Sequence, residues 1–348
     1  MQQAMHQHID FVETAGDLKN LLKDIIRNYT RYAWLTDTNT AELCLPLFDD
    51  IASNRINIPA GERNKDVSSA DKIWHELLAF GFDRNSLLIN LGGGMITDLG
   101  GFTASVFKRG IPFVHIPTSL TAQVDAAVGG KTAINTGQVK NQVGSFSPAR
   151  RIVIYPGFLE TLPERELKSG FAEVIKHALI MDADYWEIVR KFSLEADRAA
   201  WMSLIRRSVN GKQQIVEKDP MELGLRKILN FGHSIGHAFE SCFARKGILH
   251  GEAIAAGMIC EAYLSVKIMG MPEKKLEEII QLLGLHFAKL EIKDDDLNGL
   301  LENIQHDKKN KKGKMMFSLL KALGNCAYDC EVNEKQVLES IEFYKNLP

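Results

Sequence analysis

The sequence predicts an α/β domain with a Rossmann-like parallel sheet, followed by a mainly α-helical domain. In the first half, short apolar runs alternate with helical patterns, and after about residue 163 the patterns are mostly helical. The chain has 348 residues, more than one ordinary hydrophobic core accommodates. We therefore expect two domains, residues 1–163 and 164–348.

The first domain is predicted from its strand and helix candidates. Residues 69–82 have apolar side chains at helical spacing and end at a glycine, as helices often do. The strand candidates are residues 31–40, 86–94, 111–119 and 151–156. Strands that alternate with helices indicate a parallel sheet with helices on both faces.

The second domain is predicted from its helical patterns, which replace the alternation seen earlier. These patterns cover residues 170–181, 184–217, 232–245, 251–269 and 273–284. Residues 314–332 fit either a hairpin or a helix followed by a strand. The lysine cluster at 307–314 is the only charge run in the chain.

Composition and charge argue against several classes of protein. The formal net charge of −2 argues against a protein that binds nucleic acid or an anionic membrane through excess positive charge. The start of the chain has no signal-peptide pattern, and no apolar run is long enough to span a membrane. The five cysteines form no CxxC pair, so we expect reduced thiols in a cytoplasmic protein.

The segment "LGGGMITDLGGF" (residues 91–102) is a candidate phosphate-binding turn between a strand and a helix. Glycines let the backbone approach a phosphate, and the helix start offers N–H groups. The segment is not GxGxxG, so a plain strand-to-helix turn is the alternative. Asp98 either complements the helix dipole or holds a ribose or nicotinamide group.

Polar residues follow two other predicted strands. Asp37 and Asn39 come after the first strand, and Glu62 and Lys65 come after the next apolar segment. Open α/β sheets bind nucleotides at the carboxyl ends of their strands. Each of these residues, taken alone, also fits an ordinary loop.

A group of mostly basic residues lies in glycine-rich segments that we expect to be loops. Loops on a rigid sheet commonly carry ligand contacts, and Lys and Arg suit a phosphate or a carboxylate. A solvated basic surface is the alternative. The residues are Arg109, Asp125, Lys131, Lys140 and Asn141.

Two histidines stand four residues apart in "LNFGHSIGHAFE" (residues 229–240). On one continuous helix, Asn230, His233, His237 and Glu240 would share an arc of about 80°. Such an arc suits a buried ligand or histidines held by structural hydrogen bonds. Ser234 stands where the HExxH zinc motif has its catalytic Glu, which argues against a metalloprotease.

Two further segments add metal-ligand candidates. Glu173, Lys176 and His177 share one side of a predicted helix. His250 precedes another helix, whose N-terminus disfavours a protonated imidazole, so we expect His250 to be neutral and able to bind a metal. Glu173 with two histidines would make a three-ligand zinc site with an open fourth position, and the pattern leaves open which two.

Taken together, these motifs resemble the 3-dehydroquinate synthase family over roughly residues 35–325. The family implies the two domains predicted above and a homodimer. One departure is Val139, where the family usually has a glycine before the lysine of "GKN", and the preceding "NTGQ" also differs from the family form. The matching motifs are "GGGMITDLGGF", "FKRGIPFVHIPTSL", "VDAAVGGKTAIN", "KNQVGSF", "TLPERELKSGFAEVIKHALI", "GLRKILNFGHSIGHAFE" and "LHGEAIAAGM".

The resemblance assigns different roles to the histidines. Glu173, His233 and His250 would hold a divalent metal, either zinc or cobalt. His237 would not bind the metal. It would face a substrate hydroxyl and relay its proton.

The resemblance also implies contacts with NAD and with a sugar acid phosphate. Contacts with NAD are implied for Asp37, Asn39, Glu62, Lys65, Gly92, Gly93, Gly94, Asp98, Thr118, Ser119, Asp125, Lys131 and Lys140. The substrate phosphate would bind Lys131, Asn141 and Lys308, with Arg109 reaching over from the partner subunit. The substrate carboxylate would bind Lys212 and Arg226, and Asp125, Lys140, Lys176, Glu222 and Asn230 would complete the site.

The implied reaction converts 3-deoxy-D-arabino-heptulosonate 7-phosphate to 3-dehydroquinate and phosphate, a step of the shikimate pathway. It proceeds by transient oxidation with bound NAD, phosphate elimination, re-reduction and aldol closure. One alternative is a sister cyclase acting on sedoheptulose 7-phosphate, which lacks the carboxylate that Lys212 and Arg226 would bind. Another is a metal-dependent NAD polyol dehydrogenase, against which Lys131 and Lys140 argue.

Overall fold

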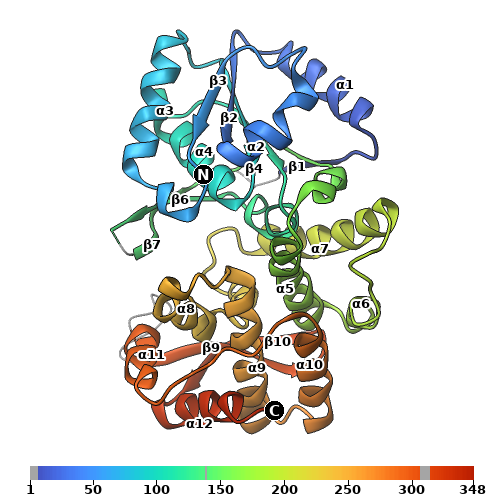
Figure 1. Ribbon diagram of the computed structural model, residues 1–348, viewed down its shortest axis with the longest axis vertical. Helices are drawn as coiled ribbons and strands as arrows, with labels where there is room; N and C mark the ends of the chain where they lie inside the picture. Colours follow the sequence, from blue (N-terminus) through green and yellow to red (C-terminus); the bar gives the residue numbers. More distant parts are fainter. Residues whose placement is uncertain (1–6, 138, 306–313) are drawn as a thin grey trace. The chain divides into compact units, whose positions relative to one another are not determined.

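The computed structural model describes residues 7–137, 139–305 and 314–348 (Figure 1). The chain divides into two compact units. The first comprises the residues up to Pro163 together with Glu195–Gln213, and the second comprises Glu164–Leu194 and Gln214–Pro348. Each unit has its own elements and is described separately.

The first unit is built on a six-stranded sheet in which every pair is parallel. The strand order is β1-β8-β5-β4-β2-β3. This arrangement confirms the α/β class, and all four predicted strands are present. The strands are β1 (His8–Phe11), β2 (Tyr32–Asp37), β3 (Arg55–Ile58), β4 (Leu87–Gly92), β5 (Phe113–Pro117) and β8 (Arg151–Ile154).

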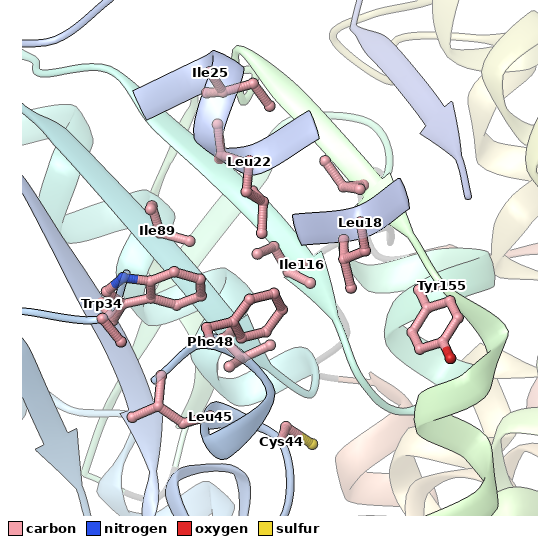
Figure 2. Packing of buried hydrophobic residues seen from close by; sticks show 14 of the residues in the cluster. Leu18, Leu22, Ile25, Trp34, Cys44, Leu45, Phe48, Ile89, Ile116 and Tyr155 are labelled. Atoms are coloured by element: carbon pink, nitrogen blue, oxygen red, sulfur yellow. The ribbon is translucent and has the colours of Figure 1, made fainter. Parts of the chain in front are cut away.

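Helices pack against both faces of this sheet. On one face, Leu18, Leu22 and Ile25 of α1 (Ala15–Ile26) pack in one cluster with Trp34 and Phe48 (Figure 2). On the other face, α4 (Gly94–Val106) contacts β4 and β5. The remaining α-helices of this unit are α2 (Thr38–Leu43), α3 (Val67–Ala79) and α7 (Arg198–Lys218) as far as Gln213. Helix α3 confirms the helix predicted at 69–82, and Asp66 caps its start by accepting the N–H of Ser69.

A two-stranded antiparallel hairpin stands apart from the main sheet. It consists of β6 (Lys131–Thr136) and β7 (Val139–Phe146). Our prediction that these glycine-rich segments are loops is therefore wrong. Thr132, Ala133 and Ile134 of β6 are buried, and β6 packs against α4, which gives the hairpin an apolar contact.

The second unit is mainly helical, as predicted. Its helices are α5 (Glu164–Met181), α6 (Ala183–Val189), α8 (His233–Cys242), α9 (His250–Met269), α10 (Glu273–His286), α11 (Asp296–Gln305) and α12 (Glu334–Lys345). Residues 315–332 form the hairpin alternative, with β9 (Met315–Ala322) antiparallel to β10 (Asn325–Val332).

The helical pattern at 184–217 is two helices and not one. Helix α6 ends at Val189, and α7 (Arg198–Lys218) begins nine residues later. Asp197 accepts the N–H of Ala200 and so caps the new helix start.

Helix α9 is the centre of the second unit. It contacts α5, α8, α10, α12 and β9, and most of its residues are fully buried. None of the helices in the described part of the chain is long and apolar enough to cross a membrane.

Candidate functional site

The predicted nucleotide-binding residues of the first unit follow the carboxyl ends of neighbouring strands. Gly92 at the end of β4 pairs in register with Pro117 at the end of β5, so the glycine turn lies beside Thr118 and Ser119. Thr118 donates its N–H to the carbonyl of Gly92 at 3.0 Å. Asp37 ends β2, which lies on the other side of β4. A parallel sheet gathers these loops at one edge, where such folds bind nucleotides.

The glycine turn leaves room for close backbone approach. Helix α4 begins at Gly94, directly after β4, as the sequence predicts. A Cβ at Gly93 would lie 3.3 Å from Oγ of Ser119, and one at Gly94 would lie 3.3 Å from Cβ of Ala126. Glycine at these positions therefore lets the start of α4 lie close to the segment that follows β5, and its free N–H groups suit a phosphate.

Lys65 connects two groups of predicted site residues. Its Nζ donates to Oδ2 of Asp98 at 2.5 Å and to Oδ1 of Asn141 at 2.6 Å, and the side chain is 4% exposed. Burial by itself would lower the pKa of Lys65, but the charges of Asp98 and Glu62 outweigh it and raise that pKa. A charged lysine therefore joins a predicted NAD residue to a predicted phosphate residue of β7.

Asp37 and Glu62 already take part in local structure. Oδ1 of Asp37 accepts the N–H groups of Asn39 and Thr40, each at 2.9 Å, and so caps α2. Oε1 of Glu62 accepts from Nδ2 of Asn135 at 2.9 Å. Asn39 is exposed beside this cap. The helix cap uses one carboxylate oxygen of Asp37. A ligand would contact the other parts of this side chain.

The basic residues of the first unit occupy three different places. Lys131 begins β6 and Lys140 lies on β7, both exposed on the hairpin. Arg109 has a positive φ of 69° and lines a surface hollow with Asp83, Arg84 and Lys108. Lys212, 6% exposed, donates to Asp125 at both its carbonyl oxygen (2.6 Å) and its Oδ1 (2.8 Å). Lys308 lies outside the described residues.

Three residues of the second unit converge on one point. Glu173 of α5 is fully buried, and His233 and His250 are the first residues of α8 and α9. Their ligand atoms all lie within 4.8 Å of one another. Oε1 of Glu173 is 3.1 Å from Nε2 of His250 and 3.6 Å from Nε2 of His233. Two imidazole nitrogens and a carboxylate form a donor set suited to Zn²⁺ or Co²⁺.

The hydrogen bonds of these histidines turn Nε2 of each ring toward Glu173. Nδ1 of His233 lies 3.1 Å from the carbonyl oxygen of Phe231, which only accepts, so Nδ1 carries the proton. Nδ1 of His250 lies 3.5 Å from Oε2 of Glu240. Carbonyl and carboxylate acceptors behind a histidine are typical of metal ligands, since they fix the tautomer that leaves Nε2 as the donor atom.

The expectation that His250 is neutral rested on the helix start alone, and its ring also lies beside two carboxylates. Burial lowers its pKa, but hydrogen bonds and charges from Glu173 and Glu240 outweigh burial and raise the pKa to about 10. The helix dipole is weaker than two adjacent carboxylates.

His237 lies close to the cluster but differs in environment. Its ring centroid is 5.2 Å from that of His233 and 6.1 Å from that of His250. It is exposed, whereas His233 is 8% exposed. His237, Glu240 and His250 also form a group with ligand atoms within 4.8 Å, so His250 borders both groups. Among the described residues, His233 belongs to the group with Glu173 and His250, and His237 does not.

The predicted arc from Asn230 to Glu240 is broken. Helix α8 begins at His233, and Gly232 before it has a left-handed backbone with φ of 78°. Asn230 belongs to a preceding 3-10 helix (Leu225–Asn230), where Nδ2 donates to Oε1 of Glu222 at 2.7 Å. The helix geometry assumed in the prediction therefore does not extend to Asn230.

The remaining predicted residues of the second unit are held by polar contacts. Lys176 is buried and forms an ion pair with Oε2 of Glu173 at 2.5 Å. Arg226 is 1% exposed and donates from Nη1 to the carbonyl of Pro220 at 2.7 Å. Glu222 adopts a positive φ of 59°, a conformation that L-residues rarely take. The loop around Glu222 is thus held in a strained form next to Asn230.

The comparisons with known proteins place the chain in a family. Residues 55–169 match the model of the 3-dehydroquinate synthase N-terminal region, and residues 170–310 match that of its C-terminal region. The chain belongs to the 3-dehydroquinate synthase family. The 3-dehydroquinate synthase of Parabacteroides distasonis is 45% identical over 94% of this chain and 96% of its own. That of Campylobacter concisus is 39% identical over 83% of this chain and 84% of its own.

Solved structures share the fold of this 3-dehydroquinate synthase family member. A 2-deoxy-scyllo-inosose synthase complexed with carbaglucose-6-phosphate, NAD⁺ and Co²⁺ matches with a TM-score of 0.83 at 24% identity, covering 96% of both chains. The 2-epi-5-epi-valiolone synthase of Streptomyces hygroscopicus, with NAD⁺ and Zn²⁺ bound, also has a TM-score of 0.83 at 24% identity, covering 99% of this chain and 98% of its own. A sulfoacetaldehyde reductase from Bifidobacterium kashiwanohense, in complex with NAD⁺, has a TM-score of 0.70 at 13% identity, covering 98% of both.

Two acidic residues of this family member were missed by the sequence analysis. Oδ1 of Asp219 accepts the main-chain N–H of Leu223 and Oδ2 accepts those of Gly224 and Arg226, so Asp219 shapes the loop that carries Glu222. Glu261 accepts three main-chain N–H groups around His233. Glu261 had a detectable signal, since it is a single acid inside the apolar run "AIAAGMICEAYL".

Proposed function

We propose that this chain converts 3-deoxy-D-arabino-heptulosonate 7-phosphate to 3-dehydroquinate and inorganic phosphate. The observation that carries the proposal is the convergence of Glu173, His233 and His250 in a chain of this family. The substrate and product differ by one phosphoric acid, so the enzyme is a carbon–oxygen lyase with no net oxidation.

The chain is proposed to use NAD and one divalent metal ion, Zn²⁺ or Co²⁺. Glu173, His233 and His250 would hold the metal, and the glycine turn with Asp98, Thr118 and Ser119 would hold NAD. When bound, NAD supplies a reversible hydride acceptor and the metal supplies Lewis acidity at the substrate hydroxyls.

His237 is proposed to exchange a proton with the substrate hydroxyl that is oxidised. It is exposed, one helical turn after His233, so it reaches ligands that approach the metal without itself being among the three buried donors. Histidine is the side chain that most often serves as a general acid or base. Lys176 would keep Glu173 ionised by its adjacent charge.

Basic residues are proposed to bind the two anionic groups of the substrate. Lys131 and Asn141 of the hairpin would bind the phosphate, together with Lys308 and with Arg109 of the partner subunit. Lys212 and Arg226 would bind the carboxylate, which a substrate such as sedoheptulose 7-phosphate lacks. Asp125, Lys140, Glu222 and Asn230 would orient these side chains. Asp37, Asn39, Glu62 and Lys65 would contact the adenosine end of NAD.

The functional form is proposed to be a homodimer in the cytoplasm. The proposal follows from the family resemblance and from five cysteines that are all unpaired in the structure. Light scattering coupled to gel filtration tests the dimer, and a monomer at micromolar concentration would contradict it.

A single assay tests the reaction. Purified protein, NAD and Zn²⁺ are mixed with the heptulosonate phosphate, and released phosphate is followed together with nicotinamide absorbance. Many turnovers of phosphate release without net NADH are expected. Net NADH would indicate a dehydrogenase, and the absence of phosphate release with metal bound would reject the proposed substrate. Sedoheptulose 7-phosphate serves as the matched substrate without a carboxylate.

A further inference from the structure

Glu261 is a fully buried carboxylate in the middle of α9. Its Oε2 accepts the N–H of Gly232 at 2.7 Å, and its Oε1 accepts the N–H groups of Ser234 at 3.0 Å and Ile235 at 3.2 Å. A buried carboxylate is costly unless hydrogen bonds compensate for its lost hydration. Here the compensating hydrogen bonds come from main-chain N–H groups at the start of α8.

The start of α8 needs an acceptor because it has no side-chain cap of its own. Gly232 is the N-cap residue, in a left-handed conformation with φ of 78° and ψ of −11°. The first N–H groups of a helix have no partner inside the helix, and their dipole favours a negative charge. Glu261 supplies both the acceptor and the charge from a different helix.

Close packing of α8 and α9 makes this contact possible. A Cβ at Gly257 would lie 2.1 Å from the carbonyl oxygen of Gly232 and 2.6 Å from the nitrogen of Gly236, so the two backbones touch. On α9, His250, Gly257 and Glu261 lie within an arc of about 40° at 100° per residue. One face of α9 therefore carries a predicted metal ligand, the contact with α8 and the carboxylate that caps α8.

The three hydrogen bonds surround His233. The N–H groups of residues 232 and 234 flank it in sequence, and both end on the Glu261 carboxylate. The His233 ring is fixed separately by the bond from Nδ1 to the carbonyl of Phe231 at 3.1 Å. Because these hydrogen bonds hold both the backbone and the ring of His233, its Nε2 points toward Glu173.

We propose that Glu261 is a positioning residue for the metal centre: it holds the start of α8 so that His233 and His250 present their nitrogens to one cation. This inference rests on the proposed metal site and deepens it. Groups that orient metal ligands commonly change metal affinity by about 10- to 100-fold when they are removed. A purely structural role would lower stability and leave metal affinity unchanged.

The test compares Glu261→Gln with Ser265→Ala by Co²⁺ titration of the metal-free full chain. Gln keeps the shape of the side chain but presents an NH₂ group to main-chain donors. Ser265 lies one turn further along α9 and accepts the N–H of Leu320 in β9, so its substitution disturbs the same helix away from α8. Thermal unfolding of both variants measures the loss of stability.

We expect Co²⁺ affinity to fall about 10- to 100-fold in Glu261→Gln, with a changed visible Co²⁺ spectrum. Ser265→Ala should keep the affinity and the spectrum. Wild-type affinity and spectrum in Glu261→Gln would overturn the inference. Glu261→Asp, which keeps the charge with a shorter reach, gives the same readouts if the Gln variant does not fold.

A His233→Ala variant separates this inference from the metal-site proposal. If it binds Co²⁺ as tightly as the wild type does, the proposed metal centre is wrong and the role of Glu261 falls with it. If it loses Co²⁺ while Glu261→Gln does not, only the positioning role is wrong.

Discussion

Nε2 of His250 lies 3.1 Å from Oε1 of Glu173, although the two residues are 77 positions apart in the chain. The contact joins the start of α9 to the buried middle of α5. Glu173 and Glu240 raise the pKa of His250 despite its burial, because both carboxylates lie beside its ring. The contact with Glu173 aligns two of the three proposed metal donors.

The first prediction separates metal binding from proton transfer. Alanine at Glu173, His233 or His250 should lower Zn²⁺ affinity by at least about 100-fold, since each substitution removes one of three donors. His237→Ala should retain one equivalent of Zn²⁺ and lose turnover. Metal content after dialysis and phosphate release measure the two effects. Equal loss of zinc in His237→Ala would reject this division of roles.

The second prediction concerns the buried ammonium of Lys65. Lys65→Met removes the partner of Asp98 and Asn141 and should lower the free energy of unfolding by about 3 kcal/mol, because an ionised group loses its pair. NAD affinity should fall in parallel. The control is Lys72→Met, whose exposed Nζ donates to the carbonyl of Asn57 and should cost less than about 0.5 kcal/mol. Isothermal titration with NAD and urea unfolding provide the measurements, and equal NAD affinities in the two variants would contradict the prediction.

Much of the first unit could be predicted because its strands are apolar runs between turn residues. The contact between Lys65 and Asn141 could not, because these residues are 76 positions apart and only the folded hairpin brings them together. The pattern also could not show that Gly232 breaks the helix, since a glycine fits a continuous helix as well as a left-handed turn.

The choice among the histidines likewise depends on tertiary structure. Spacing places His233 and His237 on one helical face, and the resemblance supplied their separate roles. The structure adds that Glu173 reaches His233 at 3.6 Å and that His233 is buried while His237 is exposed. Burial and the direction of a ring come from packing between helices, which a single sequence does not encode locally.

The third prediction tests the close packing of α8 and α9. Gly257→Ala should lower the free energy of unfolding by at least about 3 kcal/mol, because the new Cβ would lie 2.1 Å from a main-chain oxygen that cannot move by itself. It should also weaken metal binding by separating His233 from His250. Gly284→Ala in α10 is the control, since no atom lies within 4 Å of its Cβ position and alanine should stabilise by about 0.5 kcal/mol. Thermal unfolding and zinc titration measure both effects. A Gly257→Ala variant as stable as wild type would show that the helices can move apart freely.

The last prediction is a pH dependence that originates in the sheet of the first unit. His115 of β5 is 3% exposed, and its Nδ1 lies 3.2 Å from Nδ2 of Asn90, the donor of this pair. Burial lowers the pKa of His115 from 6.5 to about 3, so the folded protein keeps the ring neutral where the unfolded chain protonates it. The neutral His115 ring makes its full contribution to the free energy of unfolding above pH 6.5. This contribution is lost as the pH falls toward the pKa of His115 in the folded protein. The upper limit of this contribution to the free energy of unfolding is on the order of 5 kcal/mol.

The His115→Gln substitution removes the titrating ring. The oxygen of the new Gln side chain can still accept a hydrogen bond from Asn90. The variant should be less stable than wild type at pH 7.5, because Gln packs less well beside Phe113. As the pH is lowered from 6.5 to 4.5, the stability difference should shrink, since only the wild type loses the contribution of a neutral histidine. Urea unfolding of the metal-free protein at each pH measures the difference. A stability difference that stays constant across this range would mean that His115 keeps an ordinary pKa in the folded sheet, and that Asn90 and the surrounding strands leave room for its charge.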